Sequence, residues 1–310
     1  MTEPAIRIRG LKKTYRDKSG ESKVALKGVD LDVPRGAFFG LLGPNGAGKS
    51  TLINIMAGLV IKSSGTVEIC GNDIDAATRA ARLSIGVVPQ ELVLDTFFTV
   101  RQALEITAGY YGIPKAQRRT QEIIDAMGLA DKADIHSRRL SGGMRRRLLV
   151  GKALVHQPDV LVLDEPTAGV DVELRRQLWD YVRELNKNGT TILLTTHYLE
   201  EAEELCDEIA IINHGNVIAR DKTKNLMKGV DSKEITLSLC EPISELPASL
   251  QGLEAHVKKG KLVVNYKPSE AHIDDIIKRV HEAGFSIRDL STHEVDLEEL
   301  FVKMTSDKAA

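Results

Sequence analysis

A glycine-rich loop between an apolar strand and a helix narrows the choice of fold furthest. The loop fits the pattern G-x-x-x-x-G-K-[ST] and reads Gly43-Pro44-Asn45-Gly46-Ala47-Gly48-Lys49-Ser50. The apolar run 37–42 precedes it as a buried strand, and a helix is expected from Ser50 onward. Glycines in this pattern let backbone N–H groups surround phosphate oxygens at a helix N-terminus. The sequence therefore predicts a nucleoside triphosphate site, in which Lys49 reaches the β- and γ-phosphates and Ser50 holds Mg²⁺.

Three further apolar strands end in polar residues suited to phosphate chemistry. They are 85–88 followed by Gln90, 160–163 followed by Asp164 and Glu165, and 190–196 followed by His197. Because ligands of open α/β sheets bind beyond the carboxyl ends of the strands, we expect these side chains to converge on the loop. Asp164 would support Mg²⁺ through water, and Glu165 would polarise the attacking water. His197 would contact the γ-phosphate and hold the water and Glu165, while Gln90 would sense Mg²⁺ and the γ-phosphate. Taken singly, each has a plainer explanation as a loop histidine, a strand-end glutamine or a solvated acidic turn.

The order of elements indicates an α/β core. Short alternating runs over 4–34 are typical of antiparallel edge strands, and the pattern from about 96 to 158 is helical. Strands alternating with helices on both sides of this insertion favour a mixed, mostly parallel sheet. We therefore expect a P-loop NTPase core over 4–228 and a small α+β domain over 232–310. In the small domain we expect four strands and two helices, at 235–239, 254–257, 261–266 and 287–290, and at 269–283 and 297–304.

Composition, cysteine spacing and the length of the apolar stretches argue against several other classes of protein. With 42% hydrophobic and 28% charged residues, the 310-residue chain has enough apolar material for a sizeable core. A net charge of -2 argues neither for nor against a nucleic-acid partner. No nucleic-acid partner is expected, because the motifs of this chain have a different role. The separated cysteines Cys70, Cys206 and Cys240 form neither a zinc motif nor a disulfide framework, which suits the cytoplasm. Apolar stretches such as 160–163 are strand-length, whereas a membrane span needs about 20 residues, and 1–10 lacks a signal core.

Together these motifs resemble the nucleotide-binding subunit of ABC transporters over about residues 4–228. The motifs appear in the family's order: Tyr15 in 11–15, the Walker A loop through Thr51, Gln90, the signature Leu140-Ser141-Gly142-Gly143-Met144, the Walker B strand through Glu165, Ala168-Gly169-Val170-Asp171, and His197. Two positions depart from the commonest pattern. Met144 replaces the usual Gln of the signature, and 168–171 replaces Ser-Ala-Leu-Asp.

The resemblance implies an ATPase that uses ATP and Mg²⁺. Its catalytic set would be Lys49, Glu165 and His197, with Ser50, Gln90 and Asp164 at the metal. The nucleotide site would include Tyr15, stacked on adenine, although an edge-strand aromatic is a plainer explanation of that residue alone. The same site would extend over the following residues: Gly43, Pro44, Asn45, Gly46, Ala47, Gly48, Lys49, Ser50, Thr51 and Gln90.

The resemblance also implies partners. Two chains would pair head to tail as a homodimer, and the signature of one chain would complete the ATP site of the other. The residues expected to act in trans are Ser141, Gly142, Gly143, Met144 and Asp171. Ser141 is also a good N-cap for the helix that follows it. Separate transmembrane permease subunits would bind the dimer, which places it on the cytoplasmic face of the plasma (inner) membrane.

Three segments outside the motifs keep alternative explanations. The run 92–100, with Phe97 and Phe98, either receives a membrane partner or packs inside the helical insertion. The arginines 145–147 contact phosphate, lipid or nucleic acid, or form a solvated helix face. Residues 232–310 resemble the extra domain of the drug- and polysaccharide-exporter branch, and either regulate the dimer or only stabilise it.

The favoured function is ATP-driven dimer closure that powers a transporter of the exporter kind. The main alternative is an ABC ATPase that acts on the ribosome or on nucleic acid without a membrane partner. A third hypothesis is a regulatory module with an inactive site. The presence of Lys49, Glu165 and His197 argues against it.

Overall fold

The computed structural model describes residues 3–16, 20–167, 172–196, 198–228, 233–241, 243–247, 250, 253–267, 271–294 and 301. The chain divides into two compact units, Met1–Thr223 and Lys224–Ala310. Within the part of the chain that is described, the helices lack the length and apolarity that crossing a membrane requires.

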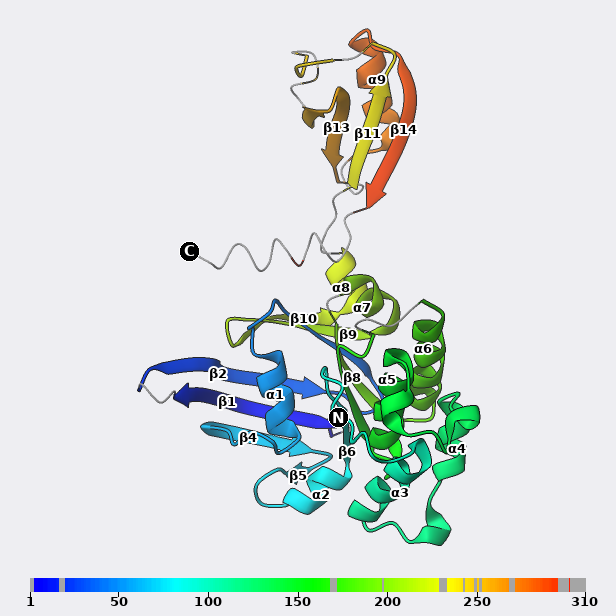
Figure 1. Ribbon diagram of the computed structural model, residues 1–310. Coiled ribbons are helices and arrows are strands. Elements are labelled where there is room, and N and C mark those ends of the chain that lie inside the picture. The colour runs from blue at the N-terminus through cyan, green and yellow to red at the C-terminus, as the bar shows by residue number, and fades with distance from the viewer. Residues whose placement is uncertain are drawn as a thin grey trace. The chain divides into compact units, whose positions relative to one another are not determined.

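A six-stranded sheet forms the centre of the first unit (Figure 1). In spatial order its strands are β10 (Asn216–Lys222), β9 (Glu208–Asn213), β3 (Phe38–Leu42), β8 (Thr191–Thr195), β7 (Val160–Asp164) and β6 (Ile85–Val88). The five strands from β9 to β6 are parallel, and β10 is antiparallel to β9. Every residue of β3, β7 and β8 is buried, as expected for parallel strands that are covered on both faces. The carboxyl ends of four neighbouring strands therefore meet at one edge.

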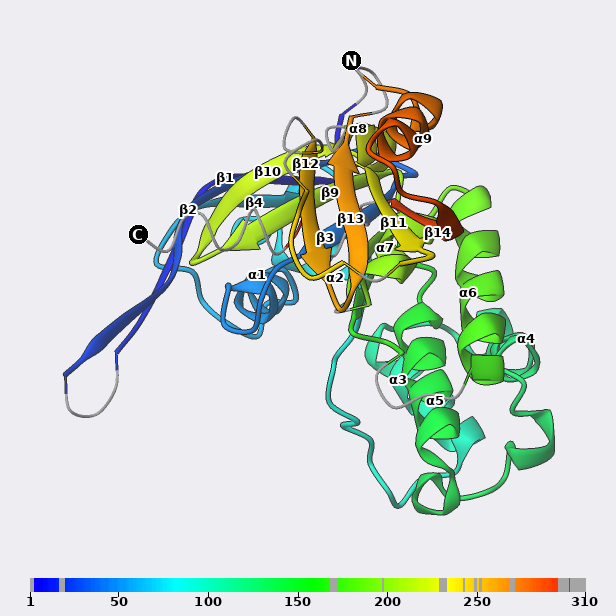
Figure 2. The ribbon, with the colours of Figure 1, turned by 90° about the horizontal axis from the view of Figure 1, so that it is seen from above.

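A second sheet is antiparallel, and its strands come from residues 6–73. Its order is β2 (Ser22–Val33), β1 (Ile6–Arg16), β4 (Ser64–Ile69) and β5 (Asn72–Asp73). β1 and β2 run side by side as a long hairpin (Figure 2). Ile6 and Ile8 of β1 are buried on one face, and they share a core cluster with Leu193 of β8 and with Leu52 of helix α1 (Lys49–Met56). The helix that follows the phosphate loop is thus held by side chains of both sheets.

Helices between β6 and β7 form the insertion, and they gather on one side of the unit in both views (Figures 1 and 2). They are α3 (Val100–Tyr110), α4 (Thr120–Ala126) and α5 (Gly142–Leu154), with short 3-10 turns at Lys115–Gln117, Ala130–Lys132 and Ser137–Arg139. A capping box fixes the start of α3, since Thr99 accepts from the N–H of Gln102 and the Gln102 side chain accepts from the N–H of Thr99. The other helices of this unit are α2 (Thr78–Leu83), α6 (Val172–Lys187) and α7 (Leu199–Leu205).

The second unit is a small α+β domain that begins within α8 (Thr223–Lys228). Its antiparallel sheet has the order β12 (Glu254–Lys258), β13 (Lys261–Tyr266), β11 (Lys233–Leu239) and β14 (Ile287–Glu294). Helix α9 (Ile273–Glu282) packs Ile276 and Val280 against Ile235 and Val264 of this sheet. The helix expected over 269–283 therefore begins later, at Ile273. The helix expected over 297–304 lies outside the described residues, apart from Phe301.

The predicted fold class is confirmed: a mixed, mostly parallel sheet, antiparallel N-terminal strands, a helical insertion and a small α+β domain. Strands β4, β5, β9 and β10 and helices α2, α7 and α8 were not predicted from the sequence. β9 is the most informative omission, because it is a central strand and five of its six residues are buried.

Candidate functional site

The phosphate loop lies between β3 and α1, and close packing against it fixes its glycines. A Cβ atom on Gly43 would lie 2.3 Å from the carbonyl oxygen of Ile212 in β9. Gly48 caps α1 with a φ of 115°, and a Cβ there would lie 2.8 Å from Cδ2 of Leu26. L residues rarely adopt the backbone conformation of Gly48, and the carbonyl oxygen of Ile212 leaves no room for a side chain at Gly43. The loop therefore depends on glycine at both positions.

Lys49 folds back over this loop. Its Nζ donates to the carbonyl oxygen of Gly43 at 2.6 Å and to that of Pro44 at 3.3 Å. Burial lowers the pKa of Lys49, while the nearby carboxylates Glu165 and Asp164 act to raise it. The structure thus places a buried ammonium group against the loop and within the influence of two acids.

Gln90 and Glu165 meet at the carboxyl ends of neighbouring strands. β6 and β7 pair in parallel with Val88 opposite Leu163, and Nε2 of Gln90 donates to Oε2 of Glu165 at 2.8 Å. Glu165 is buried and has a φ of 47°, a left-handed backbone that is uncommon for a non-glycine residue. The convergence of these two strand ends, which the sequence predicts, is therefore present in the structure.

Thr195 holds the acidic pair Asp164 and Glu165, and it was not predicted as a site residue. Its Oγ1 donates to Oδ1 of Asp164 at 2.5 Å, and the N–H of Glu165 reaches the Thr195 carbonyl oxygen at 3.0 Å and Oγ1 at 3.2 Å. Burial raises the pKa of Asp164, and the hydrogen bond from Thr195 opposes this rise. Thr195 lies opposite Asp164 in the parallel register, a pairing that the sequence alone does not reveal.

A third buried carboxylate, Glu201 of α7, was also not predicted from the sequence. Its Oε2 accepts from Oγ1 of Thr167 at 3.1 Å and from Oγ1 of Thr196 at 2.9 Å. Its Oε1 lies 3.6 Å from Nε of Arg175, and the Arg175 guanidinium stacks over the ring of Tyr198 at 4.8 Å. Glu201 therefore joins the segment after β7, the start of α6 and the end of β8.

The phosphate loop, Gln90 and Glu165 open into one cavity of about 240 Å³. Its lining consists of Tyr15, Lys23, Val24, Ala25, Asn45, Gly46, Gly48, Lys49, Ser50, Thr51, Gln90 and Glu165. The hydroxyl of Tyr15 lies 3.5 Å from Oγ1 of Thr51, and the Lys13 ammonium lies 4.7 Å from the centre of the Tyr15 ring. An exposed aromatic ring thus flanks the cavity on its β1 side.

Several predicted residues are not among those that line this cavity. Ser141, Gly142, Gly143 and Met144 lie at the start of α5, where Oγ of Ser141 accepts from the N–H of Met144 at 3.3 Å. The expected N-cap is confirmed by this contact. Asp171 and His197 lie outside the described residues.

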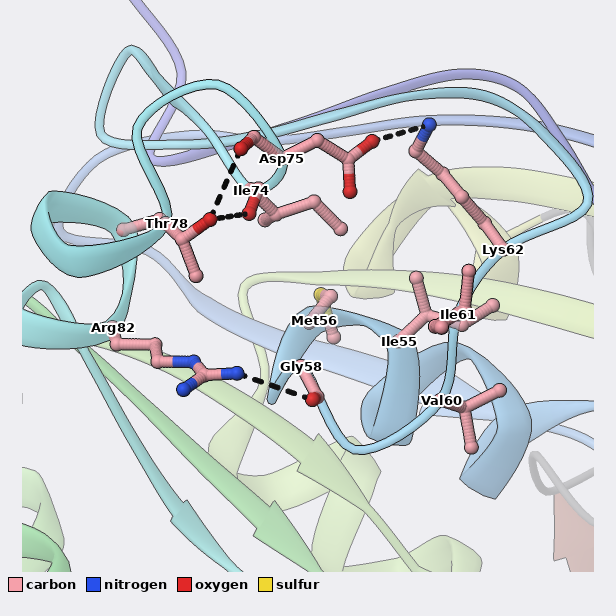
Figure 3. A pocket seen from close by; sticks show the side chains of 11 residues that line it. Ile55, Met56, Gly58, Val60, Ile61, Lys62, Ile74, Asp75, Thr78 and Arg82 are labelled. Atoms are coloured by element: carbon pink, nitrogen blue, oxygen red, sulfur yellow. Dashed lines mark hydrogen bonds and ion pairs between the residues drawn. The ribbon is translucent and has the colours of Figure 1, made fainter.

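A separate, smaller cavity of about 160 Å³ lies near the C-terminal end of α1 (Figure 3). Nζ of Lys62 pairs with Oδ2 of Asp75 at 2.7 Å across it, and NH2 of Arg82 points to the carbonyl oxygen of Gly58 at 3.3 Å (Figure 3). Its lining contains none of the residues predicted for nucleotide binding, whose loop adjoins the opposite end of α1.

Comparison with known proteins identifies the family. A family model described as ABC transporter matches residues 26–168. The chain is 36% identical to a daunorubicin resistance ATP-binding protein of Streptomyces coeruleorubidus, over 99% of this chain and 98% of the relative. The chain belongs to the ABC transporter family. It is also 45% identical to Nod factor export ATP-binding protein I of Ralstonia nicotianae, over 72% of this chain and 69% of the relative. These names confirm the predicted resemblance to the exporter branch.

Solved ABC structures share the fold of the first unit. An ATP-binding cassette, described as dimeric in a post-hydrolysis state with ADP and phosphate bound, has a TM-score of 0.65 and 26% identity, and the match covers 70% of this chain and 98% of that one. The chain is therefore an ATP-binding ABC-type ATPase, as the phosphate loop predicts.

Proposed function

We propose that this chain is the ATP-hydrolysing subunit of an exporter, with Glu165 as the catalytic carboxylate. The observation that carries the proposal is the hydrogen bond between Gln90 and Glu165, at 2.8 Å, in a cavity that Lys49 also lines. A cation suited to phosphate binding and a carboxylate thereby line the same space. This arrangement suits attack of water on a terminal phosphate.

Within this cavity each side chain has a distinct task. The N–H groups of the loop and the ammonium of Lys49 bind the β- and γ-phosphates, and Tyr15 stacks on the adenine ring. Glu165 polarises the attacking water, and Gln90 holds Glu165 in position through its amide. His197, which lies outside the described residues, is proposed to contact the γ-phosphate.

The residues proposed for Mg²⁺ fit a hard cation. Among the described residues, no three or more His, Cys, Asp or Glu side chains are arranged so that they could hold a metal ion by themselves. Mg²⁺ instead prefers one or two carboxylates together with phosphate oxygens and water. The Ser50 hydroxyl, the Gln90 amide oxygen and the Asp164 carboxylate supply oxygen donors of that kind. When bound, Mg²⁺ neutralises charge on the β- and γ-phosphates.

The signature segment points to a second copy of the chain. Ser141 and Gly142 are exposed at the N-terminus of α5 and do not line the cavity of their own chain. Dimeric association of a solved cassette supports a homodimer in which Ser141, Gly142, Gly143, Met144 and Asp171 complete the partner's site. Helix N-termini stabilise anions, which suits this role toward the γ-phosphate.

Exposed apolar side chains supply a surface for a membrane partner. Leu92, Val93 and Phe97, in the segment that follows Gln90, are 42%, 66% and 76% exposed. Phe98 is half-buried, so internal packing accounts for one of the two phenylalanines and an interface for the other. Relatives named for Nod factor export and drug resistance support separate permease subunits as the partner. This association would place the chain at the cytoplasmic face of the membrane.

The test is the variant Glu165→Gln, compared with Glu200→Gln on the exposed side of α7. We expect Glu165→Gln to bind ATP with wild-type affinity but to hydrolyse it at least about a hundredfold more slowly. ATP should then hold the variant as a dimer, measured by size-exclusion chromatography with light scattering. Wild-type hydrolysis by Glu165→Gln contradicts the assignment of the carboxylate. A strictly monomeric variant, with ATP and Mg²⁺ present, contradicts the assignment of the dimer.

A further inference from the structure

The three consecutive arginines after the signature do not have equivalent surroundings. Arg145 donates to the carbonyl oxygen of Arg138 at 2.8 Å, and Arg147 donates to that of Met127 at 2.7 Å. Both acceptors belong to the helical insertion itself. Arg146 lies between them in sequence and reaches outside the insertion.

Arg146 binds the backbone of the segment that follows β6. Its NH1 donates to the carbonyl oxygen of Pro89 and its NH2 to that of Gln90, both at 2.7 Å. The side chain is only 4% exposed, so a solvated helix face is the wrong explanation for this arginine. The planar guanidinium carries two parallel donors, which match two consecutive carbonyl groups, whereas an ammonium group cannot reproduce that geometry.

Burial of this cation is costly, and its surroundings compensate for it. Loss of water lowers the pKa of Arg146, and the negative charges of Asp164 and Glu165 oppose that change. The positive charge of the signature helix is therefore held close to the two acids of the active site. A stabilising contact of the same size could be made by a buried apolar side chain, so the charge and its fork geometry call for a functional explanation.

The contacts form a continuous path from the signature to Glu165. Ser141 caps α5, Arg146 follows on the second turn of that helix, and its guanidinium grips the main chain of Gln90. The Gln90 side chain then donates to Glu165 at 2.8 Å. An α-helix moves as a rigid element over two turns, so a displacement of Ser141 would move the backbone of Gln90 with it.

We propose that Arg146 is a positioning residue that couples the signature helix α5 to Gln90 and, through Gln90, to Glu165. Through this coupling, hydrolysis at the ATP site of one chain depends on the position of that chain's own signature segment. That segment faces the ATP bound to the partner chain of the dimer. The inference rests on the proposed function, because it assigns Glu165 to hydrolysis and the signature to the partner's nucleotide.

The test compares Arg146→Met with the matched control Arg147→Met in the full-length chain. We expect Arg146→Met to lower the kcat for ATP by about tenfold or more with the KM changed by less than about twofold. Arg147→Met, which loses contacts inside the insertion, should lower kcat by less than about threefold. Thermal unfolding of both variants measures the loss of stability separately.

A double-mutant cycle with Gln90→Ala decides whether Arg146 acts through Gln90. If it does, Gln90→Ala combined with Arg146→Met will be no slower than the slower single variant, within about twofold. Gln90→Ala combined with Arg147→Met should instead show the product of the two separate effects. Should Arg146→Met fail to fold, the same cycle is run with Arg146→Lys, which keeps the charge and loses the fork.

Three results would overturn the proposal. These are equal kcat values for Arg146→Met and Arg147→Met, losses that multiply in the cycle with Gln90→Ala, and a Gln90→Ala variant with wild-type kcat while Arg146→Met is slow. With any of these three results, the proposed function still stands if the chain hydrolyses ATP and Glu165→Gln abolishes that hydrolysis. Loss of that dependence on Glu165 refutes the proposed function instead.

Discussion

Replacing Thr195 with valine tests how the acidic pair is held at the end of β8. Thr195→Val keeps the shape of a side chain that is fully buried and removes the hydroxyl that donates to Asp164 at 2.5 Å. A hydrogen bond to a charged group contributes about 1.5–3 kcal/mol. For a unit of this size that loss corresponds to a melting temperature lower by roughly 3–12 °C.

The same change has a predicted dependence on pH. Burial already holds the pKa of Asp164 above its unfolded value, and the Thr195 hydrogen bond favours the ionised form. Without the hydroxyl that pKa rises further, so the ionised carboxylate becomes more costly at about pH 7.5. The difference in melting temperature from wild type should shrink as the pH falls through the pKa of Asp164 and the carboxyl group becomes protonated. The acid limb of kcat/KM should move to higher pH for the same reason, with kcat/KM lowered about 10- to 100-fold.

Thr191→Val is the matched control, because Thr191 begins the same strand and is equally buried. Its Oγ1 accepts from the N–H of Gly36 at 2.9 Å, far along the strand from the acids. Its loss should cost about 1 kcal/mol, without a shift in the pH profile of hydrolysis. The reasoning is refuted if Thr195→Val and Thr191→Val give the same kcat/KM and the same change of stability with pH, measured by differential scanning fluorimetry and a phosphate-release assay.

Three other changes have clear expected outcomes. Gly48→Ala forces a side chain onto a φ of 115° and should abolish ATP binding, measured by fluorescence titration, while lowering stability by about 2 kcal/mol or more. Glu201→Ala removes the acceptor for two buried hydroxyls and should cost about 2–3 kcal/mol in urea unfolding, whereas the exposed Glu200→Ala should stay within about 0.5 kcal/mol of wild type. Burial lowers the pKa of His156, whose neutral ring stacks on Tyr111 at 3.7 Å, so its stabilisation is present above about pH 6.5 and is lost as the pH falls through the folded pKa. His156→Phe keeps the stack and should therefore lose less melting temperature between about pH 7.5 and 5.5 than wild type; a larger loss would contradict this account.

Most of the residues that line the cavity could be predicted from the sequence. The residues that hold the cavity's acidic groups and strand ends in position could not. Lys49 and Gln90 follow from a loop pattern and from the rule that ligands bind at the carboxyl ends of strands, and the structure brings both to one space. Thr195 and Glu201 could not be found in this way. A threonine in a strand and a glutamate on a charged helix have no distinctive pattern. Their partners Asp164 and Thr167 lie more than thirty residues away in the chain.

The arginines show why local periodicity has limits. Helical spacing assigns three successive arginines to different faces but does not say which face is covered. The acceptors of Arg146 are backbone carbonyl groups, which carry no sequence signal of their own. β9 was omitted for a related reason, because a short apolar run such as 209–212 fits a buried helix segment as well as a central strand.

The left-handed backbone of Glu165 has a consequence for the chemistry of adjacent residues. Along a regular strand, successive side chains alternate between faces, so two neighbouring acids would serve opposite sides of a sheet. A φ of 47° breaks that alternation one residue beyond β7, and Asp164 and Glu165 both influence the same ammonium group of Lys49. One conformational irregularity thus allows a dipeptide to supply both the group proposed for the metal and the group proposed for the water. Any redesign of this turn that restores ideal strand geometry would separate the two.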